Sequence, residues 1–233
     1  MARRGLLALL LAGLAAAARG EAAAPQVVAI DAGHGGVDQG AVIRGRVEKK
    51  VVLDISEKIA ARLSRGKTLV PFLTRRTDVF VPLSDRVLNA EAAGGRAFVS
   101  IHVDKVYGRK GRGAILYVYG ANRRMPDGPA RGPEERILPS PPQSQIARSK
   151  VLAESLRAAL KAEGIKTVRY VDLGGFAVLK SSVMPSVILE VGNLRDEREA
   201  VQMCRPEFQE RLARAVARGL ERFLAPAATR ARE

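Results

Sequence analysis

The chain has 233 residues, 47% of them hydrophobic, and a formal net charge of +15. This length and composition exclude a disordered chain and suffice for one sizeable hydrophobic core. A single cysteine, Cys204, excludes an internal disulfide, so the core must stabilise the fold, and we expect Cys204 to pack rather than react.

The first 24 residues are typical of an export signal. A basic start, "MARR", precedes the apolar run "GLLALLLAGLAAAA" and the small residues of "ARGEAAA". The apolar run is shorter than the about 20 residues that cross a membrane. We therefore predict a signal peptide at residues 1–24, export to the periplasm or the cell wall, and no stable membrane anchor. An uncleaved anchor is the alternative.

The charge that remains after residue 24 is strongly positive, with 36 basic and 23 acidic residues. Such a chain favours anionic partners. Nucleic acid is a poor candidate, because only 4% of the residues are aromatic and none is tryptophan, which leaves few platforms for base stacking. We expect no nucleic-acid partner, and the sequence leaves the oligomeric state open.

Strand and helix patterns alternate after the signal. Short apolar runs bounded by polar residues or glycine predict strands at residues 27–31, 68–73, 97–102, 114–120, 175–180 and 187–191. Apolar residues spaced three and four apart predict helices at residues 48–63, at 152–160 with its end at Gly164, and from Pro206 to 224. This alternation predicts an α/β fold: a single domain with a mostly parallel, twisted sheet and helices on both faces.

One segment interrupts the alternation. Residues 121–148 hold six of the twelve prolines and no apolar periodicity, which predicts an inserted, exposed loop. A lid, a docking site for a partner and plain disorder are all open for it. We assign residues 25–224 to the folded domain and residues 225–233 to a disordered tail.

Both histidines of the chain lie where predicted strands end. His34 follows the strand at 27–31 within the stretch "VVAIDAGHGG", and His102 ends the strand at 97–102. Glu190 lies at the same end of the strand at 187–191. The carboxyl ends of parallel strands form one edge of a sheet, where ligands bind. We therefore expect these three side chains to lie in one crevice.

A second carboxylate completes the candidate site. Glu48 precedes Val51, Val52 and Ile55 by three, four and seven residues, so it lies on the apolar face of its helix. Two imidazoles and one carboxylate form a three-ligand zinc site that keeps an open position, as catalytic zinc sites do. The ion would polarise a carbonyl and lower the pKa of a water molecule to about 7. Glu190 is the candidate catalytic residue, a general acid and base. For each residue a purely structural role, such as a helix cap or a turn position, is the alternative.

Five motifs occur in the order of a known family. They are "DAGHGG", "EKKVVLDISEKIAARL", "LTRRTDVFVPLSDRVLNAE", "FVSIHVD" and "FAVLKSSVMPSVILEVGNL". The chain thereby resembles the zinc-dependent N-acetylmuramoyl-L-alanine amidases of bacterial cell walls. The resemblance implies Zn2+ as cofactor, His34, Glu48 and His102 as its ligands, and Glu190 as the catalytic glutamate. It also implies an α/β fold and cleavage of the amide between N-acetylmuramic acid and L-alanine in peptidoglycan.

The chain also departs from that family. Val103 stands where alanine is commoner, and Asn193 replaces a usual phenylalanine. Some relatives carry an autoinhibitory helix that an activator protein releases. Residues 121–148 show no amphipathic stripe, so we expect no helical plug here, and an activator remains a candidate partner. Two other functions stay open: a carboxypeptidase-like zinc peptidase of the cell wall, and a non-catalytic peptidoglycan-binding domain.

Overall fold

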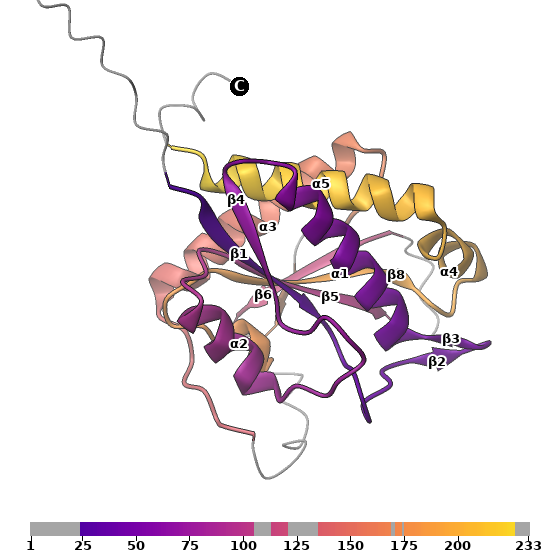
Figure 1. Ribbon diagram of the computed structural model, residues 1–233, viewed down its shortest axis with the longest axis horizontal. Coiled ribbons are helices and arrows are strands. Elements are labelled where there is room, and N and C mark those ends of the chain that lie inside the picture. The colour runs from indigo at the N-terminus through magenta and orange to yellow at the C-terminus, as the bar shows by residue number, and fades with distance from the viewer. Residues whose placement is uncertain (1–23, 105–112, 121–134, 169–170, 174, 227–233) are drawn as a thin grey trace, which may run out of the picture.

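The computed structural model describes residues 24–104, 113–120, 135–168, 171–173 and 175–226. Its centre is a six-stranded sheet in the order β4-β1-β5-β8-β6-β7, with helices on both faces (Figure 1). This confirms the predicted α/β fold. The strands are β1 (Gln26–Ala32), β4 (Leu69–Leu73), β5 (Phe98–Asp104), β6 (Ile115–Tyr119), β7 (Val171–Leu173) and β8 (Ser186–Asn193).

The sheet is mostly parallel. Strand β1 pairs in parallel with β4 and β5, β5 pairs in parallel with β8, and β7 pairs in parallel with β6. Strand β6 runs antiparallel to β8. Because helices cover both faces, side chains of both orientations must be apolar. Ala29 and Ile30, which are neighbours on β1, are accordingly both fully buried, in different core clusters.

Three long helices form the layer on one face. They are α1 (Glu48–Ser64), α3 (Gln143–Ala162) and α5 (Pro206–Leu224), and α5 packs against both of the others (Figure 1). Pro206 occupies the first turn of α5, where its missing N–H costs no hydrogen bond. Gly164 follows α3 with a φ of 70°, the left-handed conformation that commonly ends a helix.

The other face carries α2 (Leu83–Ala92) and a short 3₁₀ helix, η1 (Ala177–Leu179). The strand predicted at residues 175–180 is therefore wrong. Val178 and Leu179 are consecutive and are both buried in this layer, whereas consecutive residues of a strand would point to opposite faces. A 3₁₀ turn places both on the same side. The position beside β6 is taken by β7 instead.

The boundary of the predicted insertion also needs correction. Residues 143–148 belong to α3, whose buried face begins at Ile146 and continues through Ser149 to Leu152. Because the buried position between Ile146 and Leu152 is a serine, apolar periodicity did not indicate this start of the helix. Residues 121–134 lie outside the described residues, as do 1–23 of the proposed signal and 227–233 of the proposed tail.

A small hairpin precedes α1 and was not predicted. Strands β2 (Val42–Ile43) and β3 (Arg46–Val47) are joined by Arg44 and Gly45, both at positive φ, as a tight hairpin turn requires. Arg44 and Arg46 bind the carboxylate of Glu197 at the start of α4 (Glu197–Met203), which ties the hairpin to the C-terminal part of the chain.

Cys204 is exposed after α4, so the expectation that it packs in the core is wrong. Across the described ranges, every helix is too short or too polar to cross a membrane.

Gly219 allows α5 to approach α3 closely, since a Cβ atom there would lie 2.8 Å from Leu156 Cδ2 and 3.0 Å from Leu156 Cα. Overpacking a core contact costs about 1–3 kcal/mol, against about 1 kcal/mol gained in helix propensity. We therefore expect Gly219→Ala to lower the free energy of unfolding by about 1 kcal/mol in urea denaturation. Glu221→Ala, on the exposed side of the same helix, is the control. An unchanged midpoint for Gly219→Ala would contradict the close packing.

Candidate metal centre

His34 lies in a glycine-rich turn that continues from β1. The backbone N–H of Gly33 donates to Ile101 O at 3.1 Å, which keeps the start of the turn on the sheet. His34 then adopts a φ of 59°, a left-handed conformation that is uncommon for residues other than glycine. Its Nε2 atom lies 3.0 Å from Glu48 Oε1. The turn therefore brings this imidazole from the edge of the sheet to the first residue of α1.

Glu48 is the central side chain of the cluster. It is only 3% exposed, in agreement with its place on the apolar face of α1. Its Oε2 accepts the backbone N–H of Ala41 at 2.7 Å, and its Oε1 accepts that of Val103 at 3.1 Å. These hydrogen bonds compensate part of the cost of burying a charged carboxylate.

His102 approaches Glu48 from β5, with Nδ1 3.1 Å from Glu48 Oε1. The ring lies directly over Gly33, where an added Cβ atom would come within 2.3 Å of the imidazole. The two imidazole rings meet edge to face, with centroids 4.8 Å apart. Gly33 is thus needed because any side chain there would displace His102.

The structure brings together the three residues that the sequence singled out as ligands. One nitrogen from each of His34 and His102 and one oxygen of Glu48 lie within 4.8 Å of one another. Two imidazoles and a carboxylate are a donor set suited to a divalent transition metal.

The electrostatics of the cluster favour a cation. Burial alone would raise the pKa of Glu48, but hydrogen bonds from His102 and His34 and the charge of both rings hold it well below its usual range. Burial alone would lower the pKa of His34, yet the carboxylates of Glu48 and Asp38 outweigh it and raise that pKa. The Glu48 carboxylate therefore stays charged across the physiological pH range and attracts positive charge, as a proton or as a metal ion.

Glu190 lies beside the cluster on the neighbouring strand. It is the register partner of His102 across the parallel pair of β5 and β8. Adjacent strands are about 4.8 Å apart, and partners in register point to the same face. Glu190 is partly exposed, in contrast to the buried apolar residues on either side of it. The register therefore places Glu190 next to His102, at the edge of the sheet where the ring of His34 also lies.

Three polar residues around the cluster escaped the sequence reasoning. Asp38 Oδ2 lies 2.8 Å from His34 Nδ1, and two buried arginines, Arg75 and Arg86, donate to backbone carbonyls of the turn. The sequence did contain a pattern that could have indicated Arg86, because this residue shares the buried face of α2 with Val87 and Ala90. A buried arginine needs a partner, and the partner of Arg86 is Asp31 on β1.

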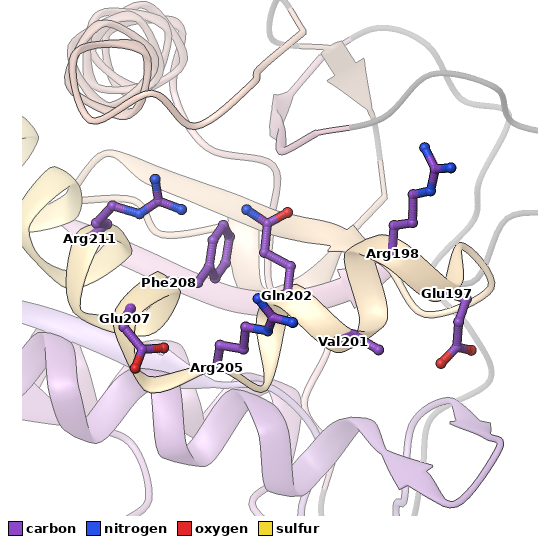
Figure 2. Close-up of a pocket in the computed structure, with 8 residues that line it drawn as sticks. All are labelled: Glu197, Arg198, Val201, Gln202, Arg205, Glu207, Phe208 and Arg211. Atoms are coloured by element: carbon purple, nitrogen blue, oxygen red, sulfur yellow. The ribbon is translucent and has the colours of Figure 1, made fainter.

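A groove lies elsewhere on the protein, on α4 and α5. It has a volume of about 630 Å³, and its lining includes Arg198, Arg205 and Arg211. Figure 2 shows the guanidinium of Arg211 beside the ring of Phe208, to whose centroid it lies 5.8 Å. Its carboxylates are those of Glu197 and Glu207, and among the described residues the potential metal ligands that cluster in a group of three are His34, Glu48 and His102, outside this groove.

The sequence matches known amidases along most of its length. A family model described as N-acetylmuramoyl-L-alanine amidase matches residues 28–222. The chain is 28% identical to N-acetylmuramoyl-L-alanine amidase AmiC of Escherichia coli O6:H1 over 230 residues, which is 89% of this chain and 55% of the relative. It is 30% identical to AmiA of Escherichia coli K12, over 84% of this chain and 75% of the relative. The chain thus spans about half the length of AmiC.

Solved structures show the same likeness. The catalytic domain of CwlV, an amidase from Bacillus (Paenibacillus) polymyxa var. colistinus, superposes with a TM-score of 0.66 at 30% identity, covering 85% of this chain and 98% of that domain. Amidase AmiC2 of Nostoc punctiforme gives a TM-score of 0.66 at 32% identity, with 85% and 97% covered. The fold, the cluster at the edge of its sheet and the match over residues 28–222 agree: the chain belongs to the N-acetylmuramoyl-L-alanine amidase family.

Proposed function

We propose that this protein hydrolyses the amide between N-acetylmuramic acid and L-alanine in peptidoglycan, with Zn2+ held by His34, Glu48 and His102. The observation that carries the proposal is the convergence of these three side chains, with Glu190 on the adjacent strand, in a chain of this family.

The donor atoms fit a zinc ion. Zinc binds imidazole nitrogen and carboxylate oxygen at about 2.0–2.2 Å in tetrahedral sites, which places neighbouring ligand atoms about 3.3 Å apart. The separations from Glu48 Oε1 to His34 Nε2 and His102 Nδ1 are 3.0 and 3.1 Å. All three donor atoms lie within 4.8 Å of one another, so the side chains would have to move closer together to share one ion. Three protein ligands leave a position open, as hydrolysis requires.

Asp38 supports the ligand role of His34. A proton on His34 Nδ1 can donate to Asp38 Oδ2, 2.8 Å away. Nε2, beside Glu48, is then the nitrogen whose lone pair would bind the metal ion. Carboxylates commonly orient metal-binding histidines in this way. The hydrogen bond from Gly40 N to Asp38 Oδ1 holds the carboxylate in turn.

Glu190 supplies the proton transfers that amide hydrolysis needs. When bound, zinc polarises the scissile carbonyl and makes a water molecule more acidic. Glu190 accepts the proton of the attacking water and delivers it to the alanine nitrogen as the C–N bond breaks. The products are a free carboxylate on the lactyl group of the glycan and a stem peptide with a free N-terminal amine.

The remaining features fit a protein that works on the cell wall. We propose that residues 1–24 direct export and are removed, and that residues 25–224 form the catalytic domain, followed by a short tail. The 36 basic and 23 acidic residues that follow residue 24 give a positive charge that favours contact with an anionic polymer.

Digestion of purified peptidoglycan by the protein after removal of residues 1–24, followed by mass spectrometry, tests the reaction. We expect intact stem peptides with a free alanine amine and glycan strands that keep their length. Shortened stems still joined to the glycan would identify a carboxypeptidase. Binding to peptidoglycan without any released product would identify a non-catalytic domain, and either result would overturn the proposal.

Glu190→Gln removes the proposed proton carrier while keeping the side-chain size. We expect turnover to fall about 10²–10⁴-fold, because general acid–base catalysis contributes that much. Zinc content, measured by elemental analysis, should stay near that of the unaltered protein. Glu221→Gln, on the exposed side of α5, serves as the control. Full turnover in Glu190→Gln would contradict the role.

His34→Ala and His102→Ala each remove one proposed ligand. We expect the zinc content of either purified variant to fall well below one ion per chain, since two protein ligands hold zinc poorly. Arg211→Ala, in the groove of Figure 2, should retain its zinc. Undiminished zinc in the histidine variants would contradict ligation by these residues.

Protons should compete with the metal at His34, whose pKa lies above the ordinary value of 6.5. Metal binding requires neutral imidazole, so affinity is expected to weaken by about tenfold per pH unit below that raised pKa. Chelator competition at pH 6, 7 and 8 measures this dependence. An affinity that stays constant from pH 8 to 6 would contradict it.

A further inference from the structure

Two buried guanidinium groups hold the turn that carries His34. Arg75 and Arg86 are only 3% and 1% exposed, although arginine is almost never fully buried without partners. Arg75 follows β4, and Arg86 lies on α2, so the two groups reach the turn from different elements. Neither of them takes part in the proposed chemistry.

Three consecutive carbonyl groups of the turn accept hydrogen bonds from these arginines. Arg75 donates through Nε to Ala32 O and through Nη2 to Gly33 O, both at 2.8 Å. Arg86 donates through Nη1 to Ala32 O at 2.8 Å and through Nη2 to His34 O at 2.7 Å. Each carbonyl group from Ala32 to His34 is thus held by at least one hydrogen bond from a buried arginine.

The hydrogen bond to His34 O matters because the backbone of this residue is strained. A non-glycine residue at a φ of 59° persists only where its surroundings enforce that conformation. Arg86 fixes the peptide plane that follows the His34 Cα atom. The direction of the imidazole toward Glu48 depends on that same backbone conformation.

Asp31 holds Arg86 in place. Its Oδ1 accepts from Arg86 Nη1 at 2.8 Å and from Thr74 Oγ1 at 2.6 Å, and its Oδ2 accepts from Ser100 Oγ at 2.6 Å. Arg86 Nε donates further to Val81 O at 3.0 Å. Arg86 therefore serves four acceptors in fixed directions. A lysine offers a single nitrogen at the end of a flexible chain and cannot reach all of them.

We propose that Arg86 is a positioning residue of the metal centre, which sets the geometry and affinity of the metal site through the carbonyl group of His34. The inference rests on the proposed metal centre and deepens it. It requires that the loss of Arg86 alters how the metal is bound, beyond any loss of stability. Ser100 provides a matched control, because it binds the same buried Asp31 but has no hydrogen bond to the turn.

The test uses Co2+ as a spectroscopic probe in the protein without residues 1–24. The visible d–d bands report ligand geometry, and chelator competition gives the Co2+ dissociation constant. For Arg86→Lys we expect the dissociation constant to rise about 10–100-fold, the range for residues that orient metal ligands, together with altered bands. For Ser100→Ala we expect a lower Tm, wild-type bands and less than about a twofold change in affinity.

Two results would overturn the inference: wild-type affinity and bands in Arg86→Lys, or equal changes in Arg86→Lys and Ser100→Ala. Should Arg86→Lys fail to fold, the double variant Asp31→Asn, Arg86→Gln is measured instead. It removes both buried charges together, and its shorter side chain at position 86 cannot reach His34 O. Wild-type affinity and bands in the double variant, or changes equal to those of Ser100→Ala, would again overturn the inference. A wild-type protein that binds no Co2+ would instead refute the metal centre itself.

Discussion

The carboxylate of Glu48 lies buried between two imidazole rings, and much of this structure serves to keep it there. Removing a carboxylate from water is costly unless its lone pairs are satisfied and its charge is balanced. Here the backbone N–H groups of Ala41 and Val103 satisfy part of that requirement. The nitrogens facing it belong to His34, in the turn after β1, and to His102, on β5. A divalent cation bound by Glu48, His34 and His102 would neutralise the negative charge of this carboxylate.

Other residues contribute no proposed ligand but support the positions of Glu48, His34 and His102. Glycine at position 33 lets the ring of His102 lie against the turn, and Gly40 does the same for Glu48 and His34. Charged side chains also bind the backbone of the turn. Lys49 donates to Gly36 O at 2.7 Å, two residues after the last carbonyl group that the arginines bind. The turn is irregular backbone, but hydrogen bonds from side chains hold the carbonyl groups of residues 32–34 and of Gly36. Such preorganisation is what a catalytic metal site needs, since misplaced ligands weaken both binding and chemistry.

Sequence patterns predicted the sheet and the cluster of His34, Glu48 and His102, but not the side chains that support this cluster. Apolar runs and helical spacing located β1, β5 and β8 and the buried face of α1, and the carboxyl ends of those strands indicated where His34, His102 and Glu190 would meet. The failures share a cause. The 3₁₀ helix η1 packs against Ala29, Phe98 and Ile188 of the sheet, and the first turn of α3 is buried through Ile146 alone, so a local pattern indicates neither of them. Arg86 binds Asp31 across 55 residues, a pairing that only the fold creates.

X-ray absorption at the zinc edge of the zinc-loaded protein reports the ligands of the ion themselves and so tests whether His34, Glu48 and His102 hold it. We expect two imidazoles and additional oxygen scatterers at about 2.0–2.2 Å, with one zinc per chain. Outer-shell scattering from one imidazole or none, or a sulfur ligand from Cys204, would show that the ion is held elsewhere.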